Sequence, residues 1–125
     1  MTIRGVGIDV ADVGRFTKLI AERGDAFTRK WFAASEIERC GHVADPGRAF
    51  AEHFAVKEAV WKSLGPGVWS RPLPWRSIVY MPDRGTVALF GAAEALAGSA
   101  AIQVAVAHKA GAAIATAVAQ DRGAH

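Results

Sequence analysis

The chain has 125 residues, of which 51% are hydrophobic and 22% are charged. This composition excludes general disorder, and the length is sufficient for one domain with a hydrophobic core. The net charge of +3 suits a partner that carries phosphates or carboxylates, and by itself it does not indicate nucleic acid.

The N-terminal third of the chain predicts one strand followed by helices. Residues 3–10 are apolar, β-branched and interrupted by glycine, which is typical of a short strand. Residues 12–23 have the spacing of an amphipathic helix, and 35–40 predict a second, short helix. The charged side chains of this short helix are expected to point outward: Glu36, Glu38 and Arg39.

The longest pattern runs from residue 48 to residue 67 and predicts a central amphipathic helix. Its apolar stripe consists of Phe50, Phe54, Trp61 and Leu64. The helix is expected to stop at Gly65-Pro66-Gly67, because proline does not continue a helix and glycine permits a turn.

The C-terminal half predicts two hairpins, made of residues 78–81 with 86–90 and of 101–108 with 112–119. The proline-rich connection before them is expected to be irregular, with Trp69 and Trp75 either packed on the core or lining a pocket. A short alanine helix at 91–97 and a frayed tail at 120–125 complete the chain. The predicted fold class is therefore α+β: a small antiparallel sheet and a long central helix in a single domain, residues 1–125.

The single cysteine, Cys40, excludes an internal disulfide and a metal site made of cysteines alone. The apolar run at the N-terminus is too short for a signal peptide and contains Asp9, and no run reaches the length of a membrane span. The expected compartment is the cytoplasm, with no membrane partner.

Asp9 is an anomaly, because its near neighbours are small or aliphatic and an ionised carboxylate there is unfavourable unless a cation faces it. Three explanations remain open. Asp9 caps the following helix, although Asp12 is better placed for that; it pairs with a basic side chain; or it holds a divalent cation.

Glu58 and Lys62 lie four residues apart at the edge of the apolar stripe of the central helix. The simplest interpretation is an exposed salt bridge within the helix. The small neighbours on the same edge, Ala51 and Ala55, indicate instead a site with room for a ligand.

Four segments carry a resemblance: GVGIDVADVGRF, FAVKEAVWKSLGPG, PWRSIVY and the apolar strand that ends at His108. In this order and spacing they resemble the holo-[acyl-carrier-protein] synthase family, the small bacterial 4′-phosphopantetheinyl transferases, over nearly the whole chain. The resemblance implies the fold of that family, a homotrimer with sites at the subunit interfaces, and a place in fatty-acid or polyketide biosynthesis. It implies transfer of the phosphopantetheine arm of coenzyme A to a serine of an apo acyl carrier protein, with release of adenosine 3′,5′-bisphosphate.

The resemblance also implies roles for individual residues. Asp9 and Glu58 would ligate Mg²⁺ together with the pyrophosphate of coenzyme A, and Lys62 would face the same phosphates. Glu58 is then the candidate base, directly or through a metal-bound water. The remaining family positions are the nucleotide-side turn and the other cofactor contacts, Gly65, Pro66, Gly67, Arg48 and His108, and the carrier-protein contact, Arg15.

The chain departs from the family pattern near the cofactor. Ala105 and Ala107 replace hydroxyl residues before His108, and His53 replaces an arginine, which would make binding pH-dependent. Ala33 replaces a helix-capping threonine. The alternative function is therefore a catalytically impaired carrier-protein or coenzyme A-binding module of the same fold. A nucleic-acid-binding domain is disfavoured, because no basic cluster or aromatic-basic alternation is present.

Overall fold

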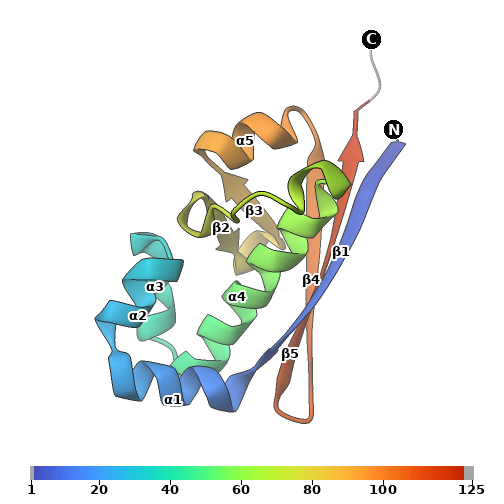
Figure 1. Ribbon diagram of the computed structural model, residues 1–125. Coiled ribbons are helices and arrows are strands. Elements are labelled where there is room, and N and C mark those ends of the chain that lie inside the picture. The colour runs from blue at the N-terminus through green and yellow to red at the C-terminus, as the bar shows by residue number, and fades with distance from the viewer. Residues whose placement is uncertain (1, 123–125) are drawn as a thin grey trace.

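The computed structural model describes residues 2–122 and combines one long helix with two antiparallel sheets (Figure 1). The larger sheet has the strand order β1-β5-β4, and β2 and β3 form a separate hairpin. The strands are β1 (Thr2–Asp12), β2 (Ile78–Met81), β3 (Thr86–Leu89), β4 (Ala101–Lys109) and β5 (Ala112–Asp121). The helices are α1 (Val13–Arg23), α2 (Asp25–Trp31), α3 (Ala34–Gly41), α4 (Pro46–Ser63) and α5 (Gly91–Ala97).

Helix α4 lies against one face of the larger sheet, with α1, α2 and α3 on its other side (Figure 1). The facing side of β5 is lined by alanines with no exposed surface: Ala113, Ala115, Ala117 and Ala119. On β1, a Cβ added to Gly5 or Gly7 would overlap the backbone carbonyl of Ser63 or Ala59. The glycines and alanines that interrupt the strand patterns are therefore what lets the helix and the sheet approach closely.

The predicted start of α1 and the predicted stop of α4 before Gly65 are confirmed, whereas α4 begins two residues before the expected residue 48. Asp12 accepts a hydrogen bond from the Gly14 amide at 3.0 Å and caps α1, as expected. Helix α4 begins at Pro46, with Asp45 as its cap, and ends at Ser63 before Gly65, whose φ is +103°. The apolar stripe is also confirmed: Phe50, Trp61 and Leu64 are buried and Phe54 is half-buried.

The outward placement predicted for Glu36 is wrong, because its carboxylate is fully buried and pairs with Lys57 at 2.5 Å. Lys57 Nζ also donates to the carbonyls of Trp75, at 2.8 Å, and of Ile78. Glu36 in turn accepts from the backbone amides of Tyr80, at 3.1 Å, and of Ala33, at 3.0 Å. One ion pair therefore joins α3, α4 and the start of β2, and its partners satisfy both buried charges.

Two other expectations also fail. Residues 25–31, which gave no helix prediction of their own, form α2, and Gln120 and Asp121 belong to β5 rather than to a frayed tail. Residues 123–125 lie outside the described residues. Both hairpins, the irregular connection and α5 are confirmed.

The sheet face turned away from α4 is apolar and largely uncovered. Val6, Ile8 and Val10 of β1 alternate with inward residues and are each more than half exposed. Ala105 and Ala107 of β4 are exposed and alternate with inward residues in the same way. Among the described residues, no helix is long and apolar enough to cross a membrane.

Candidate functional site

Asp9, Glu58 and Lys62 converge where the middle of β1 passes the C-terminal half of α4. Lys62 Nζ lies 3.0 Å from Asp9 Oδ1 and 3.3 Å from the Ile8 carbonyl oxygen. Lys62 thus reaches across to the strand, and the ion pair it makes is with Asp9 rather than along the helix. Of the explanations for Asp9, capping is excluded by Asp12, and pairing with a basic side chain is confirmed.

The Glu58 carboxyl is half-buried beside Asp9. Burial, a hydrogen bond with Asp9 and the Asp9 charge raise the pKa of Glu58 from 4.5 to about 7, against the opposing effect of Lys62. Two carboxylates in contact repel unless a proton or a cation lies with them. Lys62 supplies one positive charge, which leaves the pair suited to bind a further cation.

The donor set fits Mg²⁺, which binds oxygen ligands and is typically held by one or two protein carboxylates together with waters and phosphate oxygens. Within residues 2–122 there is no group of three or more histidine, cysteine, aspartate or glutamate side chains that would form an all-protein metal cage. Two adjacent carboxylates with an open side therefore match a shared protein–substrate site better than a structural metal site.

Ala51 and Ala55, which were expected to leave room beside Glu58, have no exposed surface and belong to the core. The space lies one turn further on. A cavity of about 480 Å³ borders Lys62 between β1 and the loop after α4, and its apolar lining includes Ile8, Trp61 and Trp69. Trp69 is exposed and donates from its indole nitrogen to the Lys62 carbonyl at 3.0 Å. The Gly65-Pro66-Gly67 turn links the helix end to this tryptophan.

Arg48 and His108 form a second cluster with a residue that the sequence analysis did not single out, Glu52. His108 Nε2 lies 2.6 Å from Glu52 Oε1, and Arg48 Nε lies 3.5 Å from the same oxygen. Glu52 sits six residues before Glu58 on α4, so this cluster is about 9 Å further toward the N-terminus of the helix.

His53 does not provide the pH-dependent charge expected of it. Burial lowers the pKa of His53 from 6.5 to about 4, so the ring is neutral at physiological pH. Its Nδ1 contacts the Ala49 carbonyl oxygen at 2.8 Å and Cys40 Sγ at 3.5 Å. Burial raises the pKa of Cys40 to about 12, so this thiol behaves as a small apolar side chain.

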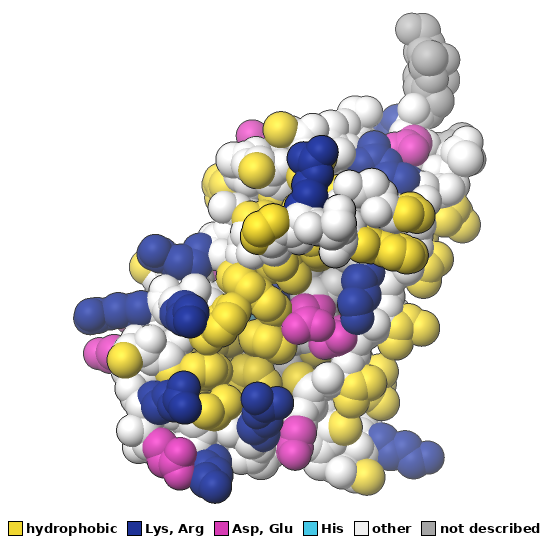
Figure 2. All heavy atoms as spheres, viewed as in Figure 1, with side chains coloured by type: hydrophobic (Ala, Val, Ile, Leu, Met, Phe, Trp, Pro, Cys, Tyr) yellow, Lys and Arg dark blue, Asp and Glu magenta, His cyan; other side chains and the backbone are white. Residues whose placement is uncertain are grey.

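Arg15 lies at the rim of a cavity of about 680 Å³ between α1, α2 and α4. Its floor is aromatic, formed by Phe16, Trp31 and Phe54, and Trp75 stacks on Phe54 with ring centroids 4.5 Å apart. Arg23 and Lys30 also border it. In Figure 2 the yellow area at the centre is bordered by several dark blue side chains and, on its right, by a magenta patch. The cavity therefore has an apolar floor, and basic side chains lie at its rim.

Two contacts were not predicted from the sequence: the buried ion pair of Lys57 with Glu36, and the contact of Glu52 with His108. For Lys57 the signal was present: positions 50, 54, 57, 61 and 64 have one helical spacing, so Lys57 lies within the apolar stripe. A charged residue in such a stripe predicts a buried partner. Glu36 stands three residues after the helix cap Ala33, the position at which glutamate folds back on the cap amide.

Comparison with known proteins gives consistent matches. Residues 5–117 match the family model of the 4′-phosphopantetheinyl transferase superfamily. The chain is 44% identical over 66 residues to the holo-[acyl-carrier-protein] synthase of Laribacter hongkongensis, which covers 53% of each chain. It is 32% identical over 122 residues to that of Geobacter sp. strain M21, covering 93% of this chain and 97% of the relative.

For the first of these curated relatives, the match spans about half of the relative's length. Among solved structures, the Helicobacter pylori holo-[acyl-carrier-protein] synthase in complex with coenzyme A superposes with a TM-score of 0.72 at 25% identity. That superposition covers 92% of this chain and 99% of the other. The similarity therefore includes both the central helix and the sheet that carry the candidate site.

Proposed function

The chain belongs to the 4′-phosphopantetheinyl transferase superfamily, and we propose that it is a holo-[acyl-carrier-protein] synthase. In this proposal it transfers the phosphopantetheine arm of coenzyme A to a serine of an apo acyl carrier protein and releases adenosine 3′,5′-bisphosphate. The observation that carries the proposal is the convergence of Asp9, Glu58 and Lys62, two carboxylates and an ammonium beside a cavity. The described residues would act as one transferase domain.

We assign the metal-binding role to Asp9 and Glu58. Mg²⁺ held there would supply positive charge to the diphosphate of coenzyme A as the bond to the arm breaks. Lys62, whose side chain is 46% exposed, is free to turn its remaining N–H groups to the same phosphates. Its contact with Asp9 keeps the ammonium at the site before substrate arrives.

Glu58 is the proposed base for the serine hydroxyl. Without a metal, burial and Asp9 raise the pKa of Glu58 to about 7; Mg²⁺ beside it would favour the ionised carboxylate, which accepts the proton directly or through a metal-bound water. Since phosphoryl transfer depends mainly on positioning and charge neutralisation, the two carboxylates Asp9 and Glu58 and the Lys62 ammonium would be sufficient protein machinery.

For the carrier protein, the basic-rimmed cavity at Arg15 supports a docking role, because an acidic partner would meet Arg15, Arg23 and Lys30. For the assembly, the exposed apolar face of the sheet supports the proposed homotrimer. Isolated domains rarely leave residues such as Val6, Ile8 and Val10 more than half exposed side by side. Sedimentation equilibrium would test the trimer; a monomer at micromolar concentration would contradict it.

The transfer itself is tested by mixing the protein with coenzyme A, Mg²⁺ and an apo acyl carrier protein and weighing the carrier by mass spectrometry. The expected result is a mass increase equal to one phosphopantetheine arm. Glu58→Gln should abolish the increase while leaving the circular dichroism spectrum unchanged. Glu94→Gln, an exposed glutamate on α5, is the matched control and should transfer normally.

If the unaltered protein leaves the carrier mass unchanged yet binds coenzyme A, the impaired binding module is the correct function. Full activity in Glu58→Gln would remove Glu58 from the mechanism.

A further inference from the structure

The Glu52 carboxylate lies between Arg48 and His108, the two residues that the resemblance makes candidate cofactor contacts. Glu52 Oε1 lies 2.6 Å from His108 Nε2 and 3.5 Å from Arg48 Nε. Arg48 Nε also lies 3.3 Å from His108 Nε2. A ring nitrogen that donates to a carboxylate does not accept a hydrogen bond from arginine at the same time, and the shorter contact identifies Glu52 as its partner. The Arg48 guanidinium and the His108 ring are thus both directed at one carboxylate oxygen.

This arrangement is what an anionic ligand would meet on arrival. An oxygen held by a histidine N–H and an arginine N–H is the contact that a phosphate oxygen makes with such a pair. We propose that Glu52 is an internal competitor for the phosphate monoester of coenzyme A, which must displace this carboxylate to reach Arg48 and His108. The inference rests on the proposed function and adds a residue that weakens cofactor binding.

The surroundings favour Glu52 as the group that moves. A cavity of about 510 Å³ adjoins the cluster, so there is space for a ligand group. Two other charged residues in its lining have partners of their own: Asp45 accepts from the Arg48 amide at 3.2 Å, and Arg39 donates to the Tyr80 carbonyl at 2.9 Å. The Glu52 side chain is 24% exposed and its contacts here are to two side chains, neither of them backbone.

The competition has a direction that the charges determine. A phosphate monoester carries about −1.5 to −2 at neutral pH, whereas a carboxylate carries a single negative charge. The monoester is therefore the stronger partner for Arg48 and His108, and its binding free energy is reduced by the contacts that Glu52 gives up. The released nucleotide, adenosine 3′,5′-bisphosphate, carries the same kind of group, so the return of Glu52 to its cations would also favour product release.

The test measures affinity by isothermal titration for coenzyme A, adenosine 3′,5′-bisphosphate and 3′-dephospho-coenzyme A, which lacks the monoester. Glu52→Gln keeps the size of the side chain and removes the competing charge. It should bind the first two ligands about fivefold more tightly, the size of a partly exposed ion pair, and the dephospho compound within twofold of the unaltered protein. Product release, followed in stopped flow, should slow by a similar factor.

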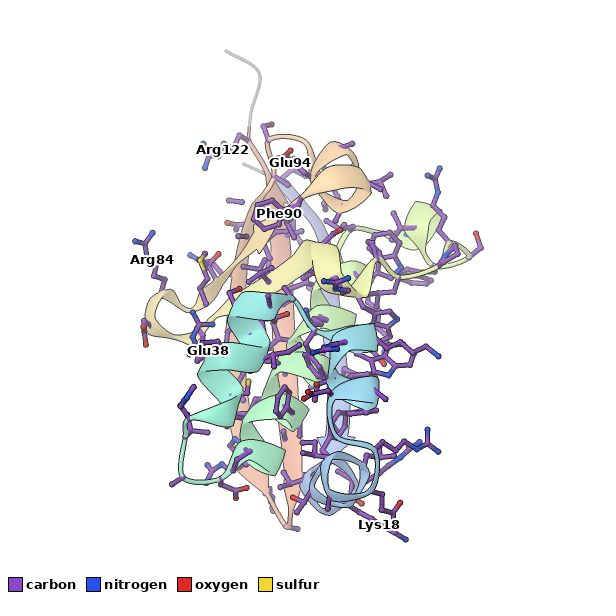
Figure 3. All side chains as sticks on the ribbon, turned by 90° about the vertical axis from the view of Figure 1, so that its left-hand side faces the viewer. Lys18, Glu38, Arg84, Phe90, Glu94 and Arg122 are labelled. Carbon is purple, nitrogen blue, oxygen red and sulfur yellow. The ribbon has the colours of Figure 1, made fainter. Side chains whose placement is uncertain are left out.

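Glu94→Gln is the matched control for a general change of charge. It removes the same charge from α5, at the opposite end of the molecule from the turn between β4 and β5 (Figure 3). All three affinities should remain unchanged. Glu52→Asp, whose shorter carboxylate does not reach both cations, should give an intermediate gain and serves if Glu52→Gln unfolds.

The inference is overturned if Glu52→Gln binds coenzyme A no more tightly, or if it gains equally for the dephospho compound. Failure of the proposed function is a separate result, namely an unaltered protein that transfers nothing to the carrier. The affinity ratios among the three ligands are measured without transfer, so each result is read independently.

Discussion

Replacing Lys57 by methionine should destabilise the protein severely, although Lys57 contacts neither cavity of the candidate site. Methionine has a similar length and is apolar, so the packing in the stripe is largely kept. What is lost is the cation beside Glu36, whose carboxylate has no exposed surface and lies 2.5 Å from Lys57 Nζ. The carbonyls of Trp75 and Ile78 lose the same donor.

The magnitude follows from these contacts. Breaking a buried ion pair by removing one partner destabilises by about 3–5 kcal/mol, because the other charge stays buried. The two backbone amides that donate to Glu36 reduce this loss. The Trp75 and Ile78 carbonyls, which lose their hydrogen-bond donor, increase it. We expect about 4 kcal/mol, against a total of roughly 10 kcal/mol for a domain of this size.

The assay is urea denaturation followed by tryptophan fluorescence, since the chain has four tryptophans and the free energy of unfolding extrapolates linearly with denaturant. Lys18→Met is the matched control. Lys18 lies on α1 with 75% of its side chain exposed, 4.0 Å from Glu22 (Figure 3), and its loss should change stability by less than about 0.5 kcal/mol.

Glu36→Gln combined with Lys57→Met completes a double-mutant cycle. The neutral pair leaves no unpaired charge, so the double variant should be more stable than the sum of the two single losses predicts, by about 2 kcal/mol. A loss below about 1 kcal/mol for Lys57→Met alone, or additive losses in the cycle, would show that the ion pair does not have the role described.

Three further predictions follow from other contacts. Burial lowers the pKa of His53 from 6.5 to about 4 in the folded protein. Between these two pH values the unfolded chain binds a proton at His53 and the folded protein does not. The free energy of unfolding should therefore fall by up to about 3 kcal/mol as pH drops from 6.5 to 4. His53→Phe should flatten that part of a stability–pH curve, and an unchanged slope would assign the acid sensitivity elsewhere. Gly7→Ala should destabilise by about 3 kcal/mol in urea, since its Cβ would overlap the Ala59 carbonyl, whereas Gly41→Ala meets nothing within 4 Å and should be nearly neutral. Arg15→Glu should raise the KM for carrier protein several-fold and leave the KM for coenzyme A unchanged; equal changes in both would argue against docking at that rim.

The elements of the fold were predictable because their patterns are local. Alternation along β4 and β5, the cap at Asp12, and the glycine-proline stop after α4 each depend on residues close in sequence. The short helix α2 was not identified, because its seven residues mix aromatic and charged side chains without a periodic face.

The candidate site was only partly predictable, since the relevant contacts join distant segments. Glu58 and Lys62 looked like an ion pair within one helix. Lys62 pairs instead with Asp9, 53 residues away, because β1 lies beside α4. The same holds for Glu52 and His108, which are 56 residues apart. The resemblance to a known family indicated Asp9 and Glu58, but it did not name Glu52, whose contacts with Arg48 and His108 only the structure shows.

The buried and the exposed charges of α4 depend on one another through the rotation of the helix. Lys57 and Glu58 are adjacent, so they point about 100° apart. The contacts of Lys57 with α3 and with the start of β2 fix one side of the helix. On the other side, Gly7 allows β1 to touch the helix backbone at Ala59. Between these two constraints Glu58 can face only the edge where Asp9 lies, which explains why a carboxylate whose pKa is raised to about 7 remains there. The packing of the core therefore keeps the carboxyl groups of Asp9 and Glu58 together, and they would separate if α4 could rotate about its axis.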